Sequence, residues 1–361
     1  MIKTEYYKDL TKMNTFGMKV KARCFIEYDS VADLVDIEFE ELARPVLHIG
    51  GGSNLLFTDD FKGTVLHSKI DFIEILEESS SVLVSVGAGV VFDDFCAWAA
   101  KEGLWGVENL SHIPGEVGAS AVQNIGAYGV EVKDVIRKVY CYDTVEEEFV
   151  SFDVEDCEYG YRDSVFKDPE VKGRYVVTHV VFALSREPRP RLEYGHLKEA
   201  VSALLSGDPR IEPSVLTHPL AGGGISPTMI RKVIIKIRKE KLPEPSVMGS
   251  AGSFFKNPVI SKEHFDRIEA AAKAEHGADC KVPHYDLPDG MIKVPAAWMI
   301  EQCGWKGRRS GGAAVYEKQP LVIVNYTGEA YPEEIIGLEK RIIASVKAKF
   351  DVELHPEVEH I

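Results

Sequence analysis

The segment Gly249–Pro258, GSAGSFFKNP, contains the side chain that we consider first for chemistry, the hydroxyl of Ser253. Glycines on both sides of this serine allow positive φ angles and a close approach of the backbone to a ligand. Two phenylalanines follow as apolar walls, and Lys256 and Asn257 could then bind an anionic or amide-bearing group. The alternative is a hairpin in which Ser253 only caps a turn, because Gly–Ser clusters are common in turns.

Two charged residues stand out in other parts of the chain. Arg162 lies in the short, turn-like segment Asp156–Lys167, and its guanidinium is a natural bidentate partner for a carboxylate. A surface ion pair with Asp163 is the alternative for this arginine. Glu357 lies in a C-terminal tail that is apolar enough to pair with a sheet, which would bring the carboxylate to a specific place; otherwise Glu357 is a solvated terminal acid.

Two glycine turns follow short apolar runs and could hold phosphate groups. The first run, Val46–Gly50, predicts a strand, and the second, Val82–Val86, predicts another. Backbone N–H groups that no Cβ shields can form an anion site, which suits an acidic protein. Ordinary β-turns are the alternative, and the pattern is not the G-x-G-x-x-G of a Rossmann fold. The first turn consists of Gly50, Gly51, Gly52, Ser53 and Asn54, and the second is Gly87-Ala88-Gly89.

A third stretch, Asn109–Val132, is rich in glycine and poor in charge. Glycine costs conformational entropy on folding, so this composition is best explained if the backbone lies against a large, flat ligand. An irregular buried loop is the alternative.

Helices and strands that could position these segments can be predicted from periodicity and capping. One helix is expected after Val91, with Gly103 as its stop. Further helices are expected to begin at Ser226-Pro227 and at Pro332, and two more to run from Ser261 to Gly277 and from Pro295 to Gly304. Strands are expected at Tyr175–Leu184 and Leu321–Asn325. The Pro- and Gly-rich sequence of Arg186–Gly224 predicts a long excursion, that is, an extended loop, that could cover a site, with Tyr194 as its conspicuous aromatic residue.

Composition limits the classes of function. The chain has 361 residues, which suggests two or three domains, and it is 45% hydrophobic and 27% charged. A net charge of −15 argues against nucleic-acid binding over a broad surface. Six dispersed cysteines without a C-x-x-C pair, and histidines without a ligand pattern, predict reduced thiols and no metal site. Without a membrane span or a signal-peptide core, a cytoplasmic protein is expected.

Seven motifs, in this order and spacing, resemble the UDP-N-acetylenolpyruvoylglucosamine reductase family of flavoenzymes, from about Asn14 to the C-terminus. They are GGGSNLL, VGAG, IPGEVGASAVQNIGAYG, YGYRDSVFK, KLPEPSVMGSAGSFFKNP, GGAAV and PEV. The resemblance implies an α+β fold with a two-part FAD-binding region of the vanillyl-alcohol-oxidase type. The implied domains are residues 1–68, rejoined by 351–361, then 69–240 with an inserted loop at 186–224, and a substrate domain at 241–350.

The resemblance also implies roles for individual residues. Ser253 would be the proton donor, and Arg162 and Glu357 would attend the substrate carboxylate. Besides the two glycine turns, the residues implied at the cofactor are Ile113, Pro114, Gly115, Gln123, Asn124, Gly126, Ala127 and Tyr128. Lys241, Asn257 and Tyr194 match family positions that contact the nucleotide sugar or NADPH, with Tyr194 on an extra substrate-covering loop. Arg309, implied as a substrate-binding residue, stands where members of the family often have Gln.

The implied activity is reduction of the enolpyruvyl group of UDP-N-acetylglucosamine enolpyruvate to UDP-N-acetylmuramate, in peptidoglycan precursor synthesis. FAD would be non-covalent, with His48, His67 or a cysteine as the alternative attachment points, and NADPH would be the reductant. A monomer that acts on small molecules, without nucleic acid or membrane, is expected. An FAD-dependent oxidase of small hydroxy compounds and a non-catalytic nucleotide-sugar or flavin-binding protein are the competing hypotheses.

Overall fold

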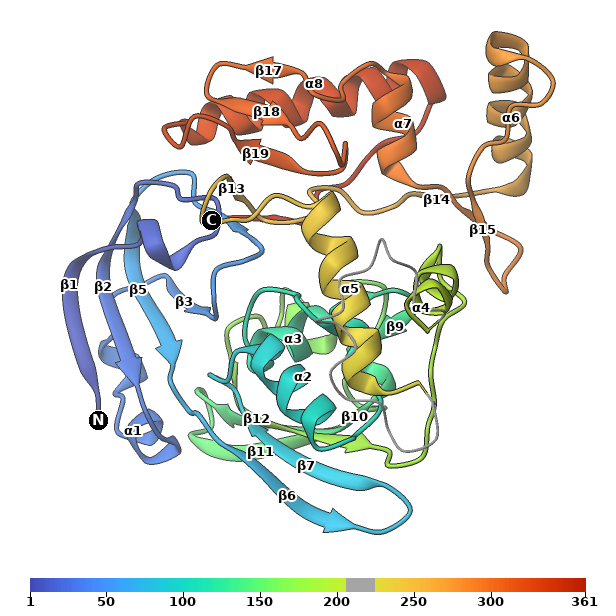
Figure 1. Cartoon of the computed structure of the whole chain (residues 1–361). Coiled ribbons are helices and arrows are strands. Elements are labelled where there is room, and N and C mark those ends of the chain that lie inside the picture. The colour runs from blue at the N-terminus through green and yellow to red at the C-terminus, as the bar shows by residue number, and fades with distance from the viewer. Residues whose placement is uncertain (206–224) are drawn as a thin grey trace. The chain divides into compact units, whose positions relative to one another are not determined.

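The computed structural model describes residues 1–205 and 225–361 (Figure 1). Contacts divide the chain into two compact units. The first unit comprises Met1–Lys8, Lys21–Gly52 and the described part of Phe61–Glu240, and the second comprises Asp9–Val20, Ser53–Asp60 and Lys241–Ile361. The division of residues 1–240 into two subdomains, and the return of residues 351–361 to the first of them, stay predictions. Residues 206–224 of the predicted excursion lie outside the described residues.

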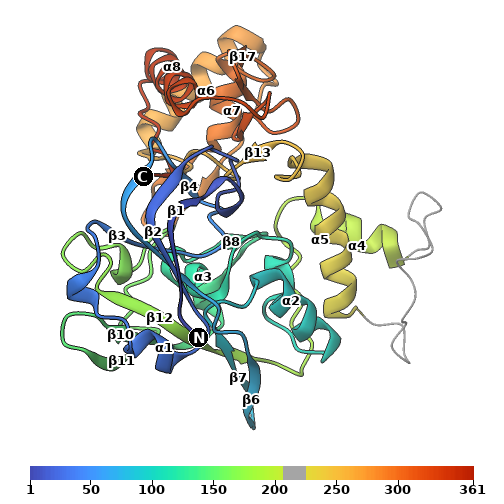
Figure 2. The same cartoon turned by 90° about the vertical axis from the view of Figure 1, so that its left-hand side faces the viewer.

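The first unit contains a four-stranded sheet in the order β1-β2-β5-β3, in which β2 and β3 both run parallel to β5 (Figure 2). One face of this sheet is apolar and packs with helix α1 (Val31–Val35) and with Tyr142 and Val176 of a second sheet. The predicted strand at Val46–Gly50 is confirmed as β3, and the turn Gly50–Gly52 follows it. The strands are β1 (Lys3–Asp9), β2 (Lys21–Tyr28), β3 (Val46–Ile49) and β5 (Phe61–Ser68).

The second sheet of this unit has five antiparallel strands in the order β11-β10-β12-β7-β6. Its central strands are rich in valine, because β-branched side chains fit a pleated surface that is buried. Both predicted strands, β7 and β12, are confirmed. The strands are β6 (Ile73–Glu78), β7 (Val82–Gly87), β10 (Ile136–Asp143), β11 (Glu148–Asp153) and β12 (Tyr175–Leu184).

Helices α2 (Phe92–Lys101) and α3 (Val117–Gln123) pack against this sheet (Figure 1). The helix predicted after Val91 is confirmed: its apolar residues recur at helical spacing and contribute to one buried core with the valines of the sheet. The sequence did not predict α3, because its glycine and small residues give no clear helical pattern. Burial stabilises this helix. A short hairpin follows, formed by β8 (Gly126–Ala127) and β9 (Val130–Glu131).

Two further helices complete the described part of the first unit. The predicted helix after Ser226 is confirmed as α5 (Pro227–Lys241), with the Ser226 hydroxyl accepting from the Met229 N–H. Its apolar face packs against α4 (Leu197–Leu205), a helix that lies within the predicted excursion Arg186–Gly224 and was not itself predicted.

The second unit has a four-stranded antiparallel sheet in the order β13-β19-β18-β17, with α8 (Pro332–Phe350) in contact with it. The predicted helices are confirmed as α6 (Lys262–His276), α7 (Ala296–Gln302) and α8, and the Ser261 hydroxyl caps α6 as expected. The remaining strands are β13 (Gly249–Ser250), β14 (Val259–Ile260), β15 (Tyr285–Asp286), β16 (Ile292–Lys293), β17 (Arg309–Ser310), β18 (Ala313–Val315) and β19 (Ile323–Asn325).

The C-terminal tail does pair with a strand, as predicted. Strand β20 (Glu359–His360) runs parallel to β4 (Leu55–Leu56) within the second unit. Among the described residues, none of the helices combines the length and the apolar character that crossing a bilayer requires.

Candidate functional site

The turn Gly50–Gly52 lies against the glycine-rich stretch around Gly115. A Cβ on Gly51 would stand 3.4 Å from the Gly115 Cα, and a Cβ on Gly50 would stand 3.2 Å from the Ala119 Cβ. Gly52 has φ +58°, in the left-handed region that favours glycine. The two glycine segments that the sequence separates by more than sixty residues are therefore neighbours, and their lack of side chains allows the contact.

The second turn, Gly87-Ala88-Gly89, packs even more closely against other backbone. A Cβ on Gly87 would stand 2.3 Å from the carbonyl oxygen of Ile70. All three N–H groups of the turn donate to backbone carbonyls, those of Phe72, Thr178 and Ile70. These N–H groups are used in hydrogen bonds within the protein, so the contribution of this turn to a phosphate site stays a prediction. Its glycines are needed in any case for the close approach of the backbone.

We expect Gly87→Ala to destabilise the protein by about 1–3 kcal/mol, because the new methyl group meets a backbone oxygen that cannot move away without distorting the sheet. Gly337→Ala is the matched control, since Gly337 lies inside α8 with open space around its Cα. That change should stabilise the protein by about 1 kcal/mol through helix propensity. Thermal unfolding monitored by circular dichroism measures both, and equal shifts for the two variants would contradict the steric argument.

The stretch from Ile113 to Tyr128 contains most of the residues implied at the cofactor. Pro114 and Gly115 precede α3, and Gly115 has φ +117°. The residue that caps the C-terminus of α3, Asn124, is in the left-handed conformation with φ +45°. Tyr128 and Gly129 both have positive φ, as a type I′ hairpin turn requires between β8 and β9.

The amide of Gln123 offers a buried donor in this stretch. Its Oε1 accepts a hydrogen bond of 2.9 Å from the Lys167 ammonium, whereas its Nε2 is buried without a partner in the structure. A buried amide N–H without an acceptor is costly, so this donor would suit a ligand bound at this stretch.

Arg162 is held against the same stretch. Its backbone has φ +57°, and its two terminal nitrogens donate to the carbonyl oxygens of Asn124 at 3.2 Å and Gly126 at 2.7 Å. The Ser164 hydroxyl adds a hydrogen bond of 2.6 Å to the carbonyl of Val122. The structure therefore brings the predicted carboxylate partner to the loop predicted to meet the cofactor.

Ser253 and Glu357 come together in the second unit. Phe255 pairs with Pro356 in an antiparallel bridge, the Glu357 N–H donates to the Phe254 carbonyl at 2.8 Å, and the Lys256 N–H donates to the carbonyl of His355 at 2.9 Å. The tail therefore runs beside the segment that carries Ser253. This serine follows Gly252, which has the predicted positive φ of +69°.

Burial of two side chains and two hydrogen bonds fix this pairing. Phe254 and Phe255 are buried, so they anchor the bend in the core of the second unit. The side-chain amide of Asn54 donates to the Glu357 carbonyl at 3.1 Å, and the Glu359 N–H donates back to the Asn54 carbonyl at 2.9 Å.

The remaining predicted substrate residues are dispersed over both units. Tyr194 lies in the first unit, where its ring meets that of Tyr128 edge to face with centroids 6.2 Å apart. In the second unit the Asn257 side chain accepts a hydrogen bond from the N–H of Ala296 at the start of α7, at 2.9 Å. Also in this unit are Lys241, exposed at the end of α5, and Arg309, whose guanidinium stacks 3.8 Å from the centroid of the Tyr326 ring.

The sequence did not reveal two arginines of α5 that link this helix to the stretch predicted to meet the cofactor. Arg231 pairs with Asp93, which also accepts from the His112 N–H, while Arg238 donates to the His112 carbonyl at 3.1 Å and bonds to the Tyr128 hydroxyl. Burial lowers the pKa of Arg238. Burial would raise the pKa of Asp93, but Arg231 outweighs it and the pKa is lowered. The sequence feature that could have indicated these contacts is the spacing of the two arginines, which are seven residues apart and so lie on one face of the helix.

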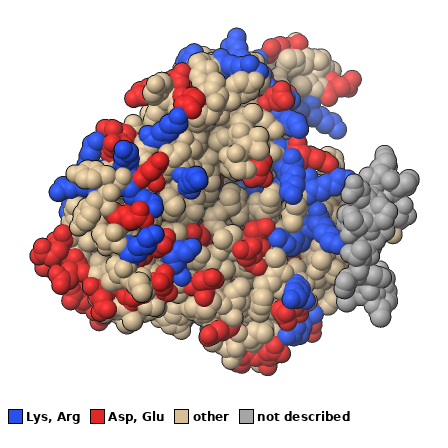
Figure 3. Space-filling model, turned by 60° about the vertical axis from the view of Figure 1, so that its left-hand side comes forward, with Lys and Arg blue, Asp and Glu red and all other residues tan. Residues whose placement is uncertain are grey.

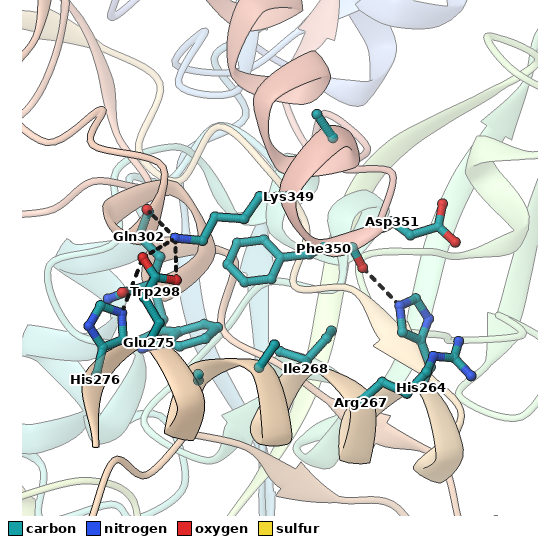
Figure 4. A pocket seen from close by; sticks show the side chains of 13 residues that line it. His264, Arg267, Ile268, Glu275, His276, Trp298, Gln302, Lys349, Phe350 and Asp351 are labelled. Atoms are coloured by element: carbon teal, nitrogen blue, oxygen red, sulfur yellow. Dashed lines mark hydrogen bonds and ion pairs between the residues drawn. The ribbon is translucent and has the colours of Figure 1, made fainter. Parts of the chain in front are cut away.

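A cavity of about 370 Å³ lies among α6, α7 and α8 of the second unit (Figure 4). Trp298 and Phe350 line it, and Lys349 bonds across it to Glu275 at 3.1 Å. It contains neither Ser253 nor Glu357, so we assign no part of the reaction to it.

Comparisons with known proteins identify the fold. Residues 22–148 match the FAD binding domain family, and residues 244–361 match the family described as UDP-N-acetylenolpyruvoylglucosamine reductase, C-terminal domain. A crystal structure of the reductase of this name from Thermus caldophilus superposes with a TM-score of 0.65 at 21% identity, covering 100% of this chain and 98% of that one. The protein therefore has the α+β, two-part FAD-binding fold of the vanillyl-alcohol-oxidase type, as predicted.

Curated relatives identify the family. UDP-N-acetylenolpyruvoylglucosamine reductase from Bacteroides fragilis is 47% identical over 98% of both chains. The reductases of Porphyromonas gingivalis and Neisseria meningitidis are 43% and 44% identical over 98% of this chain and 97% and 96% of theirs. The chain belongs to the UDP-N-acetylenolpyruvoylglucosamine reductase family.

Proposed function

We propose that this protein reduces the enolpyruvyl group of UDP-N-acetylglucosamine enolpyruvate to give UDP-N-acetylmuramate, with FAD as cofactor and NADPH as reductant. This reaction belongs to peptidoglycan precursor synthesis. The observation that carries the proposal is the pairing of the tail with residues 254–256, which sets Glu357 beside the segment of Ser253 in a member of this family.

The residues of the first unit fit FAD. The Gly50–Gly52 turn packs closely on the stretch around Gly115, and the buried Gln123 amide has a donor to offer. The residues that would hold the cofactor are Gly50–Asn54, Gly87, Gly89, Ile113–Gly115, Gln123, Asn124 and Gly126–Tyr128. Non-covalent attachment is proposed. When bound, FAD supplies the carrier that takes a hydride from NADPH and passes it to the substrate.

The protein side chains supply the remaining chemistry. An enolpyruvyl ether is an unsaturated carboxylate, so addition of hydride at its far carbon develops negative charge on the near carbon and the carboxylate. Arg162, oriented by two backbone carbonyls, would stabilise that charge, and Glu357 would attend the same carboxylate. Ser253 would donate the proton to the near carbon, since a strongly basic carbon needs no acidic donor.

Small-molecule partners and a monomer are proposed, with Tyr194, Lys241, Asn257 and Arg309 at the nucleotide sugar or NADPH. On the face that Figure 3 shows, Lys and Arg side chains gather in one area on the right of the view and are interspersed with Asp and Glu elsewhere. That distribution, with the net charge of −15, supports substrates bound locally. Cytoplasmic location is part of the same proposal, because the precursor nucleotides are water-soluble.

An anaerobic experiment tests the function. The purified protein should be yellow, acid should release free FAD, NADPH should bleach the flavin, and UDP-N-acetylglucosamine enolpyruvate should restore its colour. Bleaching by a hydroxy compound instead of NADPH would indicate an oxidase. Binding of the nucleotide sugar without any change in flavin absorbance would indicate a non-catalytic binding protein.

A further inference from the structure

Three ionisable side chains, two of them buried and one half-buried, form a line in the first unit. The Nδ1 atom of His67 lies 3.1 Å from Oε2 of Glu27, and its Nε2 atom lies 2.9 Å from Oε1 of Glu116. The side chains of His67, Glu116 and Glu27 are 6%, 11% and 27% exposed. Among the residues that the structure describes, no such group has the arrangement of a metal site, so we treat these three as a hydrogen-bonded ion network, the Glu27–His67–Glu116 triad.

The fold explains why these three residues meet. Glu27 of β2 and His67 of β5 are direct partners in a parallel ladder, and parallel strands end at the same edge of a sheet. On its other side His67 pairs with Ile49, the last residue of β3, which Gly50 follows. Glu116 belongs to neither strand: it stands at the N-terminal cap of α3, directly after Gly115.

The triad touches the surface proposed for the cofactor. Oε2 of Glu116 stands 3.2 Å from the place that a Cβ on Gly50 would occupy, while its Oε1 faces His67. The triad therefore connects the end of the parallel sheet with the loop before α3, the two segments whose glycines Gly51 and Gly115 lie in contact.

The protonation state of His67 decides whether the connection holds. An imidazolium has two N–H donors and can bond to both carboxylates, whereas the neutral ring has one, so one buried carboxylate then loses its donor. Burial lowers the pKa of His67, but Glu116 and Glu27 outweigh it and the pKa is raised. The Phe25 ring, 6.2 Å from the imidazole, is uncharged, and burial raises the pKa of the nearby Tyr28, which stays neutral.

We propose that the Glu27–His67–Glu116 triad positions the two glycine segments that bind FAD, and that FAD affinity falls when His67 loses its second proton. The inference rests on the proposed FAD site. Because the pKa of His67 is raised on folding, the contribution of the triad is complete below about pH 6.5, the value of unperturbed histidine, and is lost as the pH rises through the folded value.

The test is the dissociation constant of FAD between pH 6 and pH 9. Holoprotein is diluted serially at each pH, and the fluorescence of released FAD is measured. We expect the wild-type dissociation constant to rise at least about tenfold across this range, as for loss of a charge-assisted hydrogen bond. His67→Gln should bind FAD more weakly at pH 6 and with little dependence on pH, since an amide does not titrate here.

His179→Gln is the matched control. His179 lies on β12 of the same unit, its ring stacks on Tyr140 at 4.3 Å, and burial lowers its pKa, the opposite direction to the shift of His67. This variant should keep the wild-type pH dependence. Should His67→Gln not fold, as judged by circular dichroism, Glu27→Gln serves instead: it leaves one carboxylate partner and should reduce the pH dependence.

The outcomes separate this inference from the function. A wild-type dissociation constant that does not change with pH, or a His67→Gln variant with the wild-type dependence, would overturn the role of the triad. Failure of the wild-type protein to bind FAD at pH 6 would overturn the proposed function itself.

Discussion

Replacing Ser253 with alanine should slow reoxidation of the reduced flavin by the enolpyruvyl nucleotide by about 10²–10⁴-fold, the usual contribution of a positioned general acid. Reduction of the flavin by NADPH should stay near the wild-type rate, because that half-reaction needs no proton from this hydroxyl. Stopped-flow absorbance of the flavin measures the two half-reactions separately.

Two companion variants make the Ser253 result specific. Ser253→Cys retains a proton on a similar side chain and should keep more activity than alanine. Ser246→Ala is the control, since Ser246 is an exposed serine of the second unit that hydrogen-bonds to Glu244, and it should change neither half-reaction. Equal slowing of both half-reactions in Ser253→Ala would mean that the hydroxyl holds the bend together instead of donating the proton.

Replacing Arg162 with lysine should slow the same second half-reaction by about 10²–10³-fold, comparable to the loss of one preorganised charge-stabilising donor. Lysine keeps the positive charge but lacks the planar fork that lets arginine bond to the carbonyls of Asn124 and Gly126 and face a carboxylate. Loss of transition-state stabilisation should lower the chemical rate more than it raises KM.

Arg186→Lys is the matched control for Arg162→Lys. Arg186 is an exposed arginine of the first unit that pairs with Glu78 at 2.8 Å, so its replacement should leave both half-reactions unchanged. A variant Arg162→Lys with a raised KM and an unchanged rate of flavin reoxidation would restrict Arg162 to substrate binding.

Local sequence patterns correctly predicted helices α2, α5, α6, α7 and α8 and some of the strands, among them β3, β7 and β12. Each of these elements is indicated by residues that lie within a few positions of one another, so it can be predicted from sequence alone. Examples are the helical spacing after Val91, the caps at Ser226 and Ser261, and the β-branched strand at Val82. The ordered motifs from GGGSNLL to PEV were also sufficient to indicate the family and its cofactor, since their glycines and polar residues recur in a long, specific order.

Tertiary structure decided the features that join distant segments. Helix α3 forms in a glycine-rich stretch because burial against the sheet outweighs weak helix propensity. Glu357 would be an ordinary terminal acid except that the backbone of the tail pairs with residues 254–256, about a hundred positions earlier. His67 meets Glu116 only because a parallel strand and the loop before α3 end at one place. Such contacts depend on which distant strands and loops lie side by side, and residues that are close together in the chain do not determine that.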